Sequence, residues 1–314
     1  MFKKRNLVSK LWLKYTNKPA YKNYKWDLIN YKQSQFTNFL VRGEKLNNVN
    51  KIKAVANATN QLNLTHSGNA GDIIYALPTI KKIYELTGAN INLYLRLGRP
   101  LNLPNYNTHP VGNVMLNQKM ADMLSPLIQS QNYINRCEVY DNQVIDIDLD
   151  YFRAGIIPTQ GNIARWCSYI TGVSPDLWKK WLDVEPDVKF ADSIVIARSG
   201  RYQNKAIDYS FLNKYDKIVF IGIESEYKDI LQFIPKIEWL QVNDFLQMAQ
   251  IIAGCKFFIG NQSFPYSIAE ALKMPRILEV CYEIINVVPE GENGYDFFFQ
   301  EHFEWLVSNL NGDN

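Results

Sequence analysis

The chain has 314 residues, of which 47% are hydrophobic and 21% are charged. This balance excludes disordered and fibrous proteins, and the length favours two domains of about 100–150 residues each. The net charge of +3 is unevenly divided, because residues 1–34 carry +8 and the rest of the chain carries −5. Since the sequence has neither an apolar run long enough to span a membrane nor a secretory signal, we expect a cytoplasmic protein.

Residues 1–50 are expected to form a basic, aromatic-rich N-terminal extension. Its first 34 residues interleave seven aromatic rings with nine lysines and arginines. This pattern suits a bilayer surface, a nucleic acid or an anionic acceptor glycan. It equally suits a solvated arm whose rings lie on the body of the protein. The extension therefore allows peripheral attachment at the inner face of the membrane, and its role stays open at this point.

Residues 51–185 alternate between strand and helix patterns. Strands are predicted at 62–66, 91–97, 137–140 and 144–149, and helices at 73–86, 120–128 and 162–171. Strands that alternate with helices indicate a parallel sheet with crossover connections. We therefore expect a first Rossmann-like, doubly wound domain here.

A proline flanked by charged residues at 184–191 is expected to join this domain to a second one, residues 186–314. The alternation then resumes. Strands are predicted at 193–197, 217–221, 239–242, 256–259 and 276–280, and helices at 245–253, 266–272 and 297–310. The order and spacing predict a second doubly wound domain of the α/β class.

Asp72 lies where the first predicted strand passes into a helix. One interpretation is a helix cap, since an aspartate there can satisfy free backbone N–H groups. The other is a general base that takes the proton of an attacking hydroxyl, because open α/β sheets hold ligands at the carboxyl ends of their strands. His66, Asn69 and Gly71 would lie beside it, on the acceptor side of the site.

Two loops of the second domain have the chemistry of a diphosphate site. Cations clustered around a glycine at a strand end can stabilise a leaving diphosphate, and small polar residues at a helix start can bind it through backbone N–H groups. The diphosphate candidates are Arg198, Ser199, Gly200, Arg201, Lys205, Asn261, Gln262 and Ser263. Glu224 and Glu270 are candidates for the ribose or base, although Glu270 equally suits the helix dipole.

A rival metal-binding motif occurs at Asp146-Ile-Asp-Leu-Asp150. Overlapping Asp-x-Asp triplets can hold a divalent cation under a sugar diphosphate. The same alternation is typical of a half-exposed strand, with its aspartates on the wet face. We favour the strand, and the three histidines are too dispersed to indicate a metal cluster. The four cysteines are single, which indicates reduced thiols.

Three segments together resemble the ADP-heptose:lipopolysaccharide heptosyltransferases. They are Gly71-Asp-Ile-Ile-Tyr-Ala-Leu-Pro78, Lys205 after a strand-end loop, and the segment Phe258 to Pro275. The resemblance covers about residues 61–281. It implies the GT-B architecture, in which two Rossmann-like domains face a cleft, with Asp72 as the catalytic base and Lys205 as a phosphate-contacting lysine. Gln262 and Ser267 depart from the family, which usually has an acidic residue and a histidine at these positions to hold the donor.

The resemblance implies an inverting, metal-independent glycosyltransferase that moves a hexosyl or heptosyl unit. Its partners would be a nucleotide-diphosphate sugar donor and a glycan or other hydroxyl acceptor, with no cofactor, metal or specific nucleic acid. Two alternatives stay open. The chain could bind a nucleotide or glycan without catalysis, as the changes at Gln262 and Ser267 suggest, or it could be a nucleotide-sugar epimerase.

Overall fold

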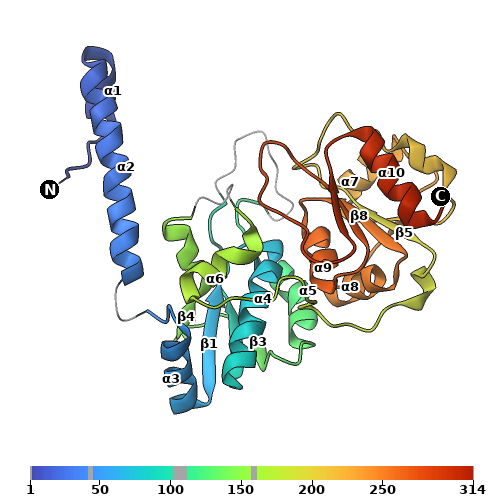
Figure 1. Cartoon of the computed structure of the whole chain (residues 1–314), viewed down its shortest axis with the longest axis horizontal. Coiled ribbons are helices and arrows are strands. Elements are labelled where there is room, and N and C mark those ends of the chain that lie inside the picture. Colours follow the sequence, from blue (N-terminus) through green and yellow to red (C-terminus); the bar gives the residue numbers. More distant parts are fainter. Residues whose placement is uncertain (1, 42–44, 102–111, 157–160, 314) are drawn as a thin grey trace.

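The computed structural model describes residues 2–41, 45–101, 112–156 and 161–313. They form two α/β halves and a helical arm that projects from the first half (Figure 1). Among these residues no helix is both long enough and apolar enough to cross a membrane.

The first half is built on a four-stranded parallel sheet in the order β3-β2-β1-β4. Its strands are β1 (Gln61–His66), β2 (Asn90–Leu95), β3 (Arg136–Val139) and β4 (Ile147–Asp148). Its helical elements are α3 (Val49–Thr59), α4 (Ala70–Thr87), α5 (Gln118–Gln129), η1 (Leu149–Ala154), η2 (Ile163–Arg165) and α6 (Trp166–Thr171). The apolar side chains of β1 and β2 are buried, as a parallel sheet covered on both faces requires.

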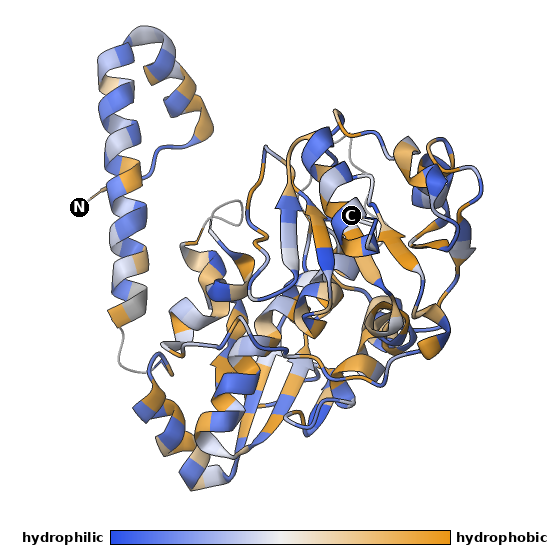
Figure 2. Ribbon diagram, turned by 45° about the vertical axis from the view of Figure 1, so that its right-hand side comes forward, coloured by the Kyte–Doolittle hydropathy of each residue, from blue (hydrophilic) through white to orange (hydrophobic). Residues whose placement is uncertain are grey.

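The second half is built on a six-stranded parallel sheet in the order β10-β9-β8-β5-β6-β7. Its strands are β5 (Ile194–Ala197), β6 (Ile218–Ile221), β7 (Glu238–Leu240), β8 (Phe257–Asn261), β9 (Arg276–Glu279) and β10 (Gly294–Phe297). Its helical elements are η3 (Val188–Phe190), η4 (Ser210–Lys214), α7 (Glu224–Leu231), α8 (Phe245–Gly254), α9 (Phe264–Leu272) and α10 (Gln300–Asn311). Figure 2 shows hydrophobic residues concentrated along the strands and on the helix faces that cover them.

Two parallel sheets in one chain confirm the predicted α/β class with two doubly wound halves. The prediction missed α3, and it missed α7 and β10, which are short and carry many polar residues. It also made the strand at 144–149 too long, because β4 ends at Asp148 and a 3₁₀ helix follows directly. The sheets lie on either side of residues 184–191, so we propose 51–185 and 186–314 as the domain bounds.

Each sheet has a switch point, where successive connections leave in opposite directions. In the first sheet β1 lies between β2 and β4, and in the second sheet β5 lies between β6 and β8. Loops that follow the two strands at a switch point diverge and leave a crevice at the carboxyl edge of the sheet. The segments predicted to hold the base and the diphosphate follow β1, β5 and β8, so the topology places them at these crevices, whereas Glu224 follows β6.

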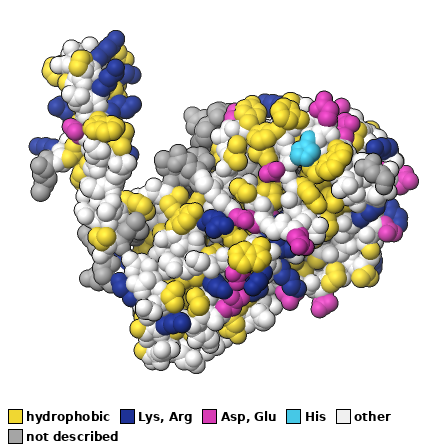
Figure 3. Space-filling model, viewed as in Figure 1, with side chains coloured by type: hydrophobic (Ala, Val, Ile, Leu, Met, Phe, Trp, Pro, Cys, Tyr) yellow, Lys and Arg dark blue, Asp and Glu magenta, His cyan; other side chains and the backbone are white. Residues whose placement is uncertain are grey.

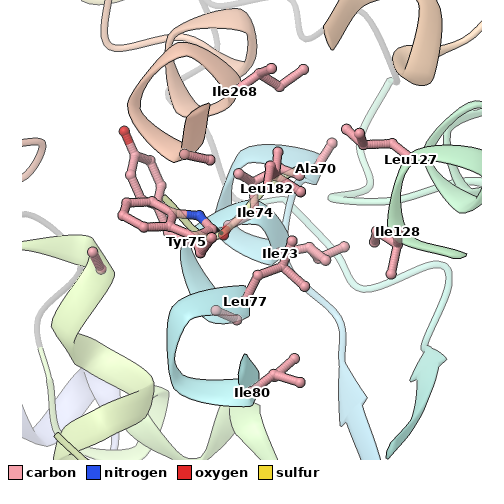
Figure 4. Packing of buried hydrophobic residues seen from close by; sticks show 14 of the residues in the cluster. Ala70, Ile73, Ile74, Tyr75, Leu77, Ile80, Leu127, Ile128, Leu182 and Ile268 are labelled. Carbon is pink, nitrogen blue, oxygen red and sulfur yellow. Dashed lines mark hydrogen bonds between the residues drawn. The ribbon is translucent and has the colours of Figure 1, made fainter. Parts of the chain in front are cut away.

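The two halves share one hydrophobic core, which sets their relative position. Helix α4 of the first half packs against α9 of the second half. In Figure 4, Ala70, Ile74 and Tyr75 of α4 lie below Ile268 of α9. Trp181 closes this contact, because its indole nitrogen donates to the Ile74 carbonyl at 3.1 Å and its backbone N–H donates to Ala271 at 2.9 Å.

The N-terminal extension forms helices α1 (Leu7–Thr16) and α2 (Lys18–Val41), which fold back on each other as a hairpin. The Phe2 ring, which precedes α1, stacks on the Tyr24 ring of α2 with 5.7 Å between the ring centroids. The hairpin stands away from both halves (Figure 1), so the interpretation that its rings lie on the body of the protein is wrong. The far end of α2 approaches the first half, where the Phe36 ring fills the space that a side chain at Gly155 would occupy.

Candidate active site

A cavity of about 590 Å³ lies between the two halves. Its wall includes the start of α4 and the start of α5 from the first half. The second half contributes the loops that follow β5, β6 and β8, together with part of α8. Clefts between domains, at the carboxyl ends of parallel strands, are the usual place for nucleotide ligands. We therefore treat this cavity as the candidate active site.

Asp72 reaches this cavity from the first turn of α4. Its Oδ2 atom accepts a hydrogen bond of 2.9 Å from the Arg153 guanidinium and one of 3.3 Å from the Asn69 backbone N–H. Its other oxygen, Oδ1, accepts no hydrogen bond from any residue that the structure describes. Asp72 therefore caps the helix with one oxygen and has the other available to a ligand, so the two interpretations of this residue are compatible.

Arg153 is a site residue that our sequence reasoning missed. It lies in η1 after β4, and it bridges Asp72 at 2.9 Å and Asp150 at 3.0 Å. Burial alone would raise the pKa of Asp150, but His66, a hydrogen bond from Ser67 and Arg153 together hold it below its usual value. The spacing of Asp150 and Arg153 along the sequence carries no signal of this role, because only the return of β4 beside β1 brings them to Asp72.

His66 lies beneath the cavity, outside the lining. Its Nδ1 atom accepts a hydrogen bond from the Gly68 N–H at 2.9 Å, so the ring proton sits on Nε2. Burial lowers the pKa of His66 in spite of the nearby carboxylates of Asp150 and Asp72, so the ring is neutral at neutral pH. The structure therefore does not bring His66 to the cavity, and His66 instead supports the loop before α4.

The close contacts around Gly68 explain why this position in the segment before Asp72 is a glycine. A Cβ atom built at Gly68 would lie 2.6 Å from the Asp72 carboxylate and 2.6 Å from the His66 ring. At Gly71 the nearest atoms to such a Cβ are 3.8 Å away, which is ordinary contact distance. Gly68 therefore lets the loop pass close to Asp72, while Gly71 and Asn69 line the cavity.

The two arginines in the loop after β5 differ in whether their charge is compensated within the protein. Arg198 lines the cavity, yet its guanidinium donates two hydrogen bonds to Glu279, at 2.7 and 2.9 Å, and is 6% exposed. Its charge is thus compensated inside the protein, which corrects its expected role in holding a diphosphate. Arg201 also lines the cavity, and it makes no ion pair with the described residues.

Lys205 lies outside the cavity lining and is exposed. The structure therefore does not bring the lysine that was expected to contact a phosphate to this cavity. Gly200 is also outside the lining. Ser199 does line the cavity, and its backbone N–H donates to Asn261 Oδ1 at 3.0 Å.

Lys119 is a second residue that sequence reasoning missed. It lies in the first turn of α5 and lines the cavity from the first half, whereas Arg201 lines it from the second half. A cation there is unfavourable for the helix, since a helix N-terminus already carries partial positive charge, and the first turn of α5 has no acidic residue. Lys119 and Arg201 therefore place two cations, both without an ion-pair partner among the described residues, on the walls that the two halves contribute. This arrangement favours an anionic ligand.

The polar residues after β8 have different surroundings. Asn261 is fully buried, and its amide donates to the carbonyls of Ser199 and Arg201, so it ties two loops together and lies outside the lining. This corrects its predicted contact with the diphosphate. Gln262 and Ser263 line the cavity, although the Gln262 amide is held by Asn286 at 2.8 Å and by the Cys281 N–H at 3.1 Å.

The acidic residues predicted to contact the ribose or base, Glu224 and Glu270, have different surroundings. Glu224 lines the cavity at its rim, 63% exposed and paired with Lys228. Glu226, two residues further, lines the cavity as well, and burial raises its pKa despite backbone hydrogen bonds and the nearby Arg201. Glu270 is buried outside the lining and paired with Arg276 and Lys273, so its predicted role at the donor is wrong.

Part of the cavity lining is apolar. Trp239 comes from β7, Phe245 from α8 and Phe264 from the start of α9, and Met120 and Met123 come from α5. The Phe245 and Phe264 rings lie 4.2 Å apart. A flat aromatic group such as a nucleobase suits a wall of this kind, since stacking on aromatic and thioether groups needs no hydrogen bonds.

The aspartates of the rival metal motif are each engaged by protein groups. Asp146 accepts from the Asn63 N–H at 2.8 Å, Asp148 pairs with Arg96 at 3.2 Å, and Asp150 pairs with Arg153. Asp150 is buried, so its predicted place on the wet face of a strand is wrong. Within the described parts of the chain, no cluster of three or more His, Cys, Asp or Glu side chains is arranged to hold a metal.

No family model and no curated protein matches the chain. Solved structures do match it at low sequence identity. The glycosyl transferase family 9 protein from Veillonella parvula DSM 2008 superposes with a TM-score of 0.52 and 9% identity, covering 79% of this chain and 88% of that one. The chain has the fold of these glycosyltransferases.

Two further structures have the same arrangement of two halves. The E. coli ADP-heptose lps heptosyltransferase II superposes with a TM-score of 0.51 and 10% identity, covering 81% of this chain and 99% of that one. The E. coli heptosyltransferase WaaC with ADP gives a TM-score of 0.50 and 10% identity, covering 81% and 98%. This chain therefore has a GT-B fold, in agreement with the expectation from its motifs.

Proposed function

We propose that this protein is a metal-independent, inverting glycosyltransferase that transfers a sugar from a nucleotide-diphosphate donor to a hydroxyl acceptor. The observation that carries the proposal is that Asp72 lies in the same cavity as Arg201 and Lys119, which have no ion-pair partner among the described residues. A carboxylate in one cavity with two cations matches the needs of this reaction, in which a proton is removed at one end and a diphosphate departs at the other.

In the proposed reaction the acceptor oxygen attacks the anomeric carbon while the bond from that carbon to the diphosphate breaks. The acceptor proton passes to Oδ1 of Asp72, the oxygen that no described residue engages. Arg153 holds Oδ2 at 2.9 Å and so orients the carboxylate. Negative charge grows on the departing diphosphate, and Arg201 and Lys119 stabilise it. A single displacement of this kind inverts the anomeric configuration.

The solved structures support the choice of donor class. Two of the proteins that share this fold are named as heptosyltransferases, and one of them was solved with ADP. We infer that a nucleoside diphosphate occupies the cavity here, with its base against Trp239 and Phe245 and its ribose near Glu226. Gln262 is held by protein partners, so we expect the sugar contacts to differ from those in the heptosyltransferases.

A panel of nucleoside diphosphates tests the donor site by thermal shift, because a ligand that binds only the folded state raises the melting temperature. We expect one base to give the largest shift, and Arg201→Ala or Lys119→Ala to weaken its binding about 5- to 30-fold. Lys205→Ala is the matched control and should leave affinity unchanged. Equal losses in Lys205→Ala and Arg201→Ala would contradict the assignment of the cavity.

Sugar transfer itself is tested by incubating the protein with the corresponding nucleotide sugars, with and without EDTA to remove divalent metal ions. Asp72→Asn keeps the shape of the side chain, so we expect it to retain the nucleotide-induced shift and to lose turnover by about 100-fold or more. A binding protein without catalysis is the second candidate, favoured by the protein-held Gln262 and the buried Ser267. Tight nucleotide binding with no product from any donor would support that candidate, and a changed sugar released from donor alone would indicate an epimerase.

A further inference from the structure

The arm formed by α1 and α2 has an inner face that closes the hairpin. Leu13 of α1 and Tyr24 of α2 are buried in it, and Phe2 packs on the rings of Tyr24 and Tyr31. The Tyr24 hydroxyl accepts a hydrogen bond of 3.1 Å from the Arg5 backbone N–H. These contacts fix which side of α1 faces α2.

The opposite side of α1 is apolar and open to solvent. Its residues recur at positions 7, 8, 11, 12 and 15, which places them on one face of a helix, and Leu13 lies on the other face. They are Leu7, Val8, Leu11, Trp12 and Tyr15, and their exposed fractions are 70, 76, 44, 63 and 77%. Five large apolar side chains in two and a half turns are far more than a solvated helix needs.

The arm also carries many cations. Lys10 and Lys14 lie along one edge of the apolar face of α1, and Lys18, Lys22, Lys25 and Lys32 of α2 recur at helical spacing along one stripe. Trp26 and Ile29, 65% and 46% exposed, lie on the same stripe. In Figure 3, hydrophobic and basic side chains gather at the end of the arm that carries α1. Asp27 is the only acidic residue in the first 34 positions.

We propose that the exposed face of α1, together with the lysines beside it, docks the protein on an anionic lipid bilayer. A helix with aromatic and aliphatic residues on one side and lysines at its flanks lies along the lipid headgroups, where both groups are satisfied. A charge of +8 repels a second copy of the same arm. Aliphatic side chains such as Leu7 and Val8 have no counterpart in single-strand nucleic-acid binding, which relies on aromatic rings and cations.

The arm is joined to the half of the protein that carries Asp72. The Phe36 ring of α2 packs over Gly155, which lies two residues after Arg153, the partner of Asp72. Docking of α1 would therefore hold the first half of the cleft beside the membrane surface. An acceptor anchored in the membrane would then be brought to Asp72, whereas the soluble donor would reach the second half from solution.

Vesicle flotation with the full-length protein tests the proposal without any measurement of activity. We expect binding to vesicles of phosphatidylcholine mixed with phosphatidylglycerol, weak binding to phosphatidylcholine alone, and a decline with salt as the charges are screened. The variant Leu11→Asp/Trp12→Asp should lose at least about tenfold in partitioning. The variant Lys22→Gln/Lys25→Gln should bind more weakly and with a smaller dependence on salt.

The matched control is Asn23→Asp/Asn30→Asp, because it changes the net charge by the same amount on an exposed polar face of the same arm. We expect this variant to lose much less than Leu11→Asp/Trp12→Asp, and both should keep the nucleotide-induced thermal shift of the parent. No binding of the parent to anionic vesicles, or equal losses in the two variants, would overturn the proposal. So would tighter binding to a single-stranded oligonucleotide than to vesicles at the same salt, or self-association that the α1 variant abolishes.

Discussion

The guanidinium of Arg153 lies 2.9 Å from the carboxylate of Asp72, although 80 residues separate them in the sequence. The side chains are 12% and 18% exposed, and Arg153 also holds Asp150, which is 8% exposed. The pair joins the two strands at the switch point of the first sheet, since Asp72 follows β1 and Arg153 follows β4. The orientation of the candidate base therefore depends on a residue outside its own motif.

Removal of Arg153 should affect both stability and turnover. Arg153→Ala removes the cation from Asp72 and leaves Asp150 with the more distant Arg99, at 3.9 Å, so we expect the free energy of unfolding to fall by about 2–3 kcal/mol in urea denaturation. Transfer should fall by roughly 100-fold, because a base displaced by about 1 Å loses its alignment. Arg165→Ala is the control, since Arg165 is 44% exposed and its pair with Glu290 should contribute less than about 1 kcal/mol. Equal costs for the two changes would remove the special role of Arg153.

Gly68 and Gly71 should respond differently to alanine. Gly68→Ala places a methyl group against Asp72 and His66, and we expect a loss of about 1–3 kcal/mol together with most of the turnover. Gly71 lies in the first turn of α4, and a methyl group there would meet its neighbours at ordinary contact distance, so Gly71→Ala should be neutral or stabilise by up to about 1 kcal/mol. Urea denaturation and a nucleotide thermal shift on both variants check this. A stable, active Gly68→Ala would show that Asp72 needs no close passage of the loop.

Trp181 should hold the two halves together. It is 2% exposed, it bonds to Ile74 and Ala271 in opposite halves, and the Lys273 ammonium lies 4.4 Å from its ring centroid. Trp181→Ala should cost about 3–5 kcal/mol. It should also weaken nucleotide binding, because the cavity has walls in both halves. Trp178→Ala, in the same segment and 60% exposed, should cost less than about 0.5 kcal/mol. Similar melting temperatures for the two variants would contradict this.

Glu226 should make stability depend on pH in the mildly acidic range. Burial raises the pKa of Glu226 in the folded state above its ordinary value of 4.5. At a pH between the ordinary pKa and the raised pKa, the folded state keeps a proton that the unfolded state has released. Stability from this group therefore falls as pH rises through that window and stays lower at neutral pH. Glu226→Gln removes the cost of burying an ionised carboxylate. This variant should match the parent in stability near pH 4 and be more stable at pH 7. The gain should be about 1 kcal/mol or less, because the site is partly solvated.

The same change should weaken nucleotide binding about fivefold, if the carboxylate accepts a hydrogen bond from the ribose as we propose. Urea denaturation at several pH values and calorimetry with the preferred nucleoside diphosphate measure the two effects separately. A stability difference that grows as pH falls would have the wrong sign and would contradict the assigned shift. Glu224→Gln is the control, because that side chain is 63% exposed at the rim.

The order of strands and helices follows from patterns within short stretches of the chain. Runs such as Ile194 to Ala197 are apolar because both faces of a parallel strand are buried, and this composition is visible without any neighbour. The glycine-containing turn at Asp72 is equally local. These patterns are enough to predict two doubly wound halves and a ligand site at their strand ends.

Which side chains face the ligand depends on pairs that are distant in sequence. Arg198 is neutralised by Glu279 and Glu270 by Arg276, so neither serves the role that its residue type suggested. Arg153 and Lys119 become important only because β4 returns beside β1 and α5 faces the second half. Charge compensation and burial are properties of the folded chain. A motif can therefore indicate where chemistry occurs, while the tertiary contacts decide which charges stay available for it.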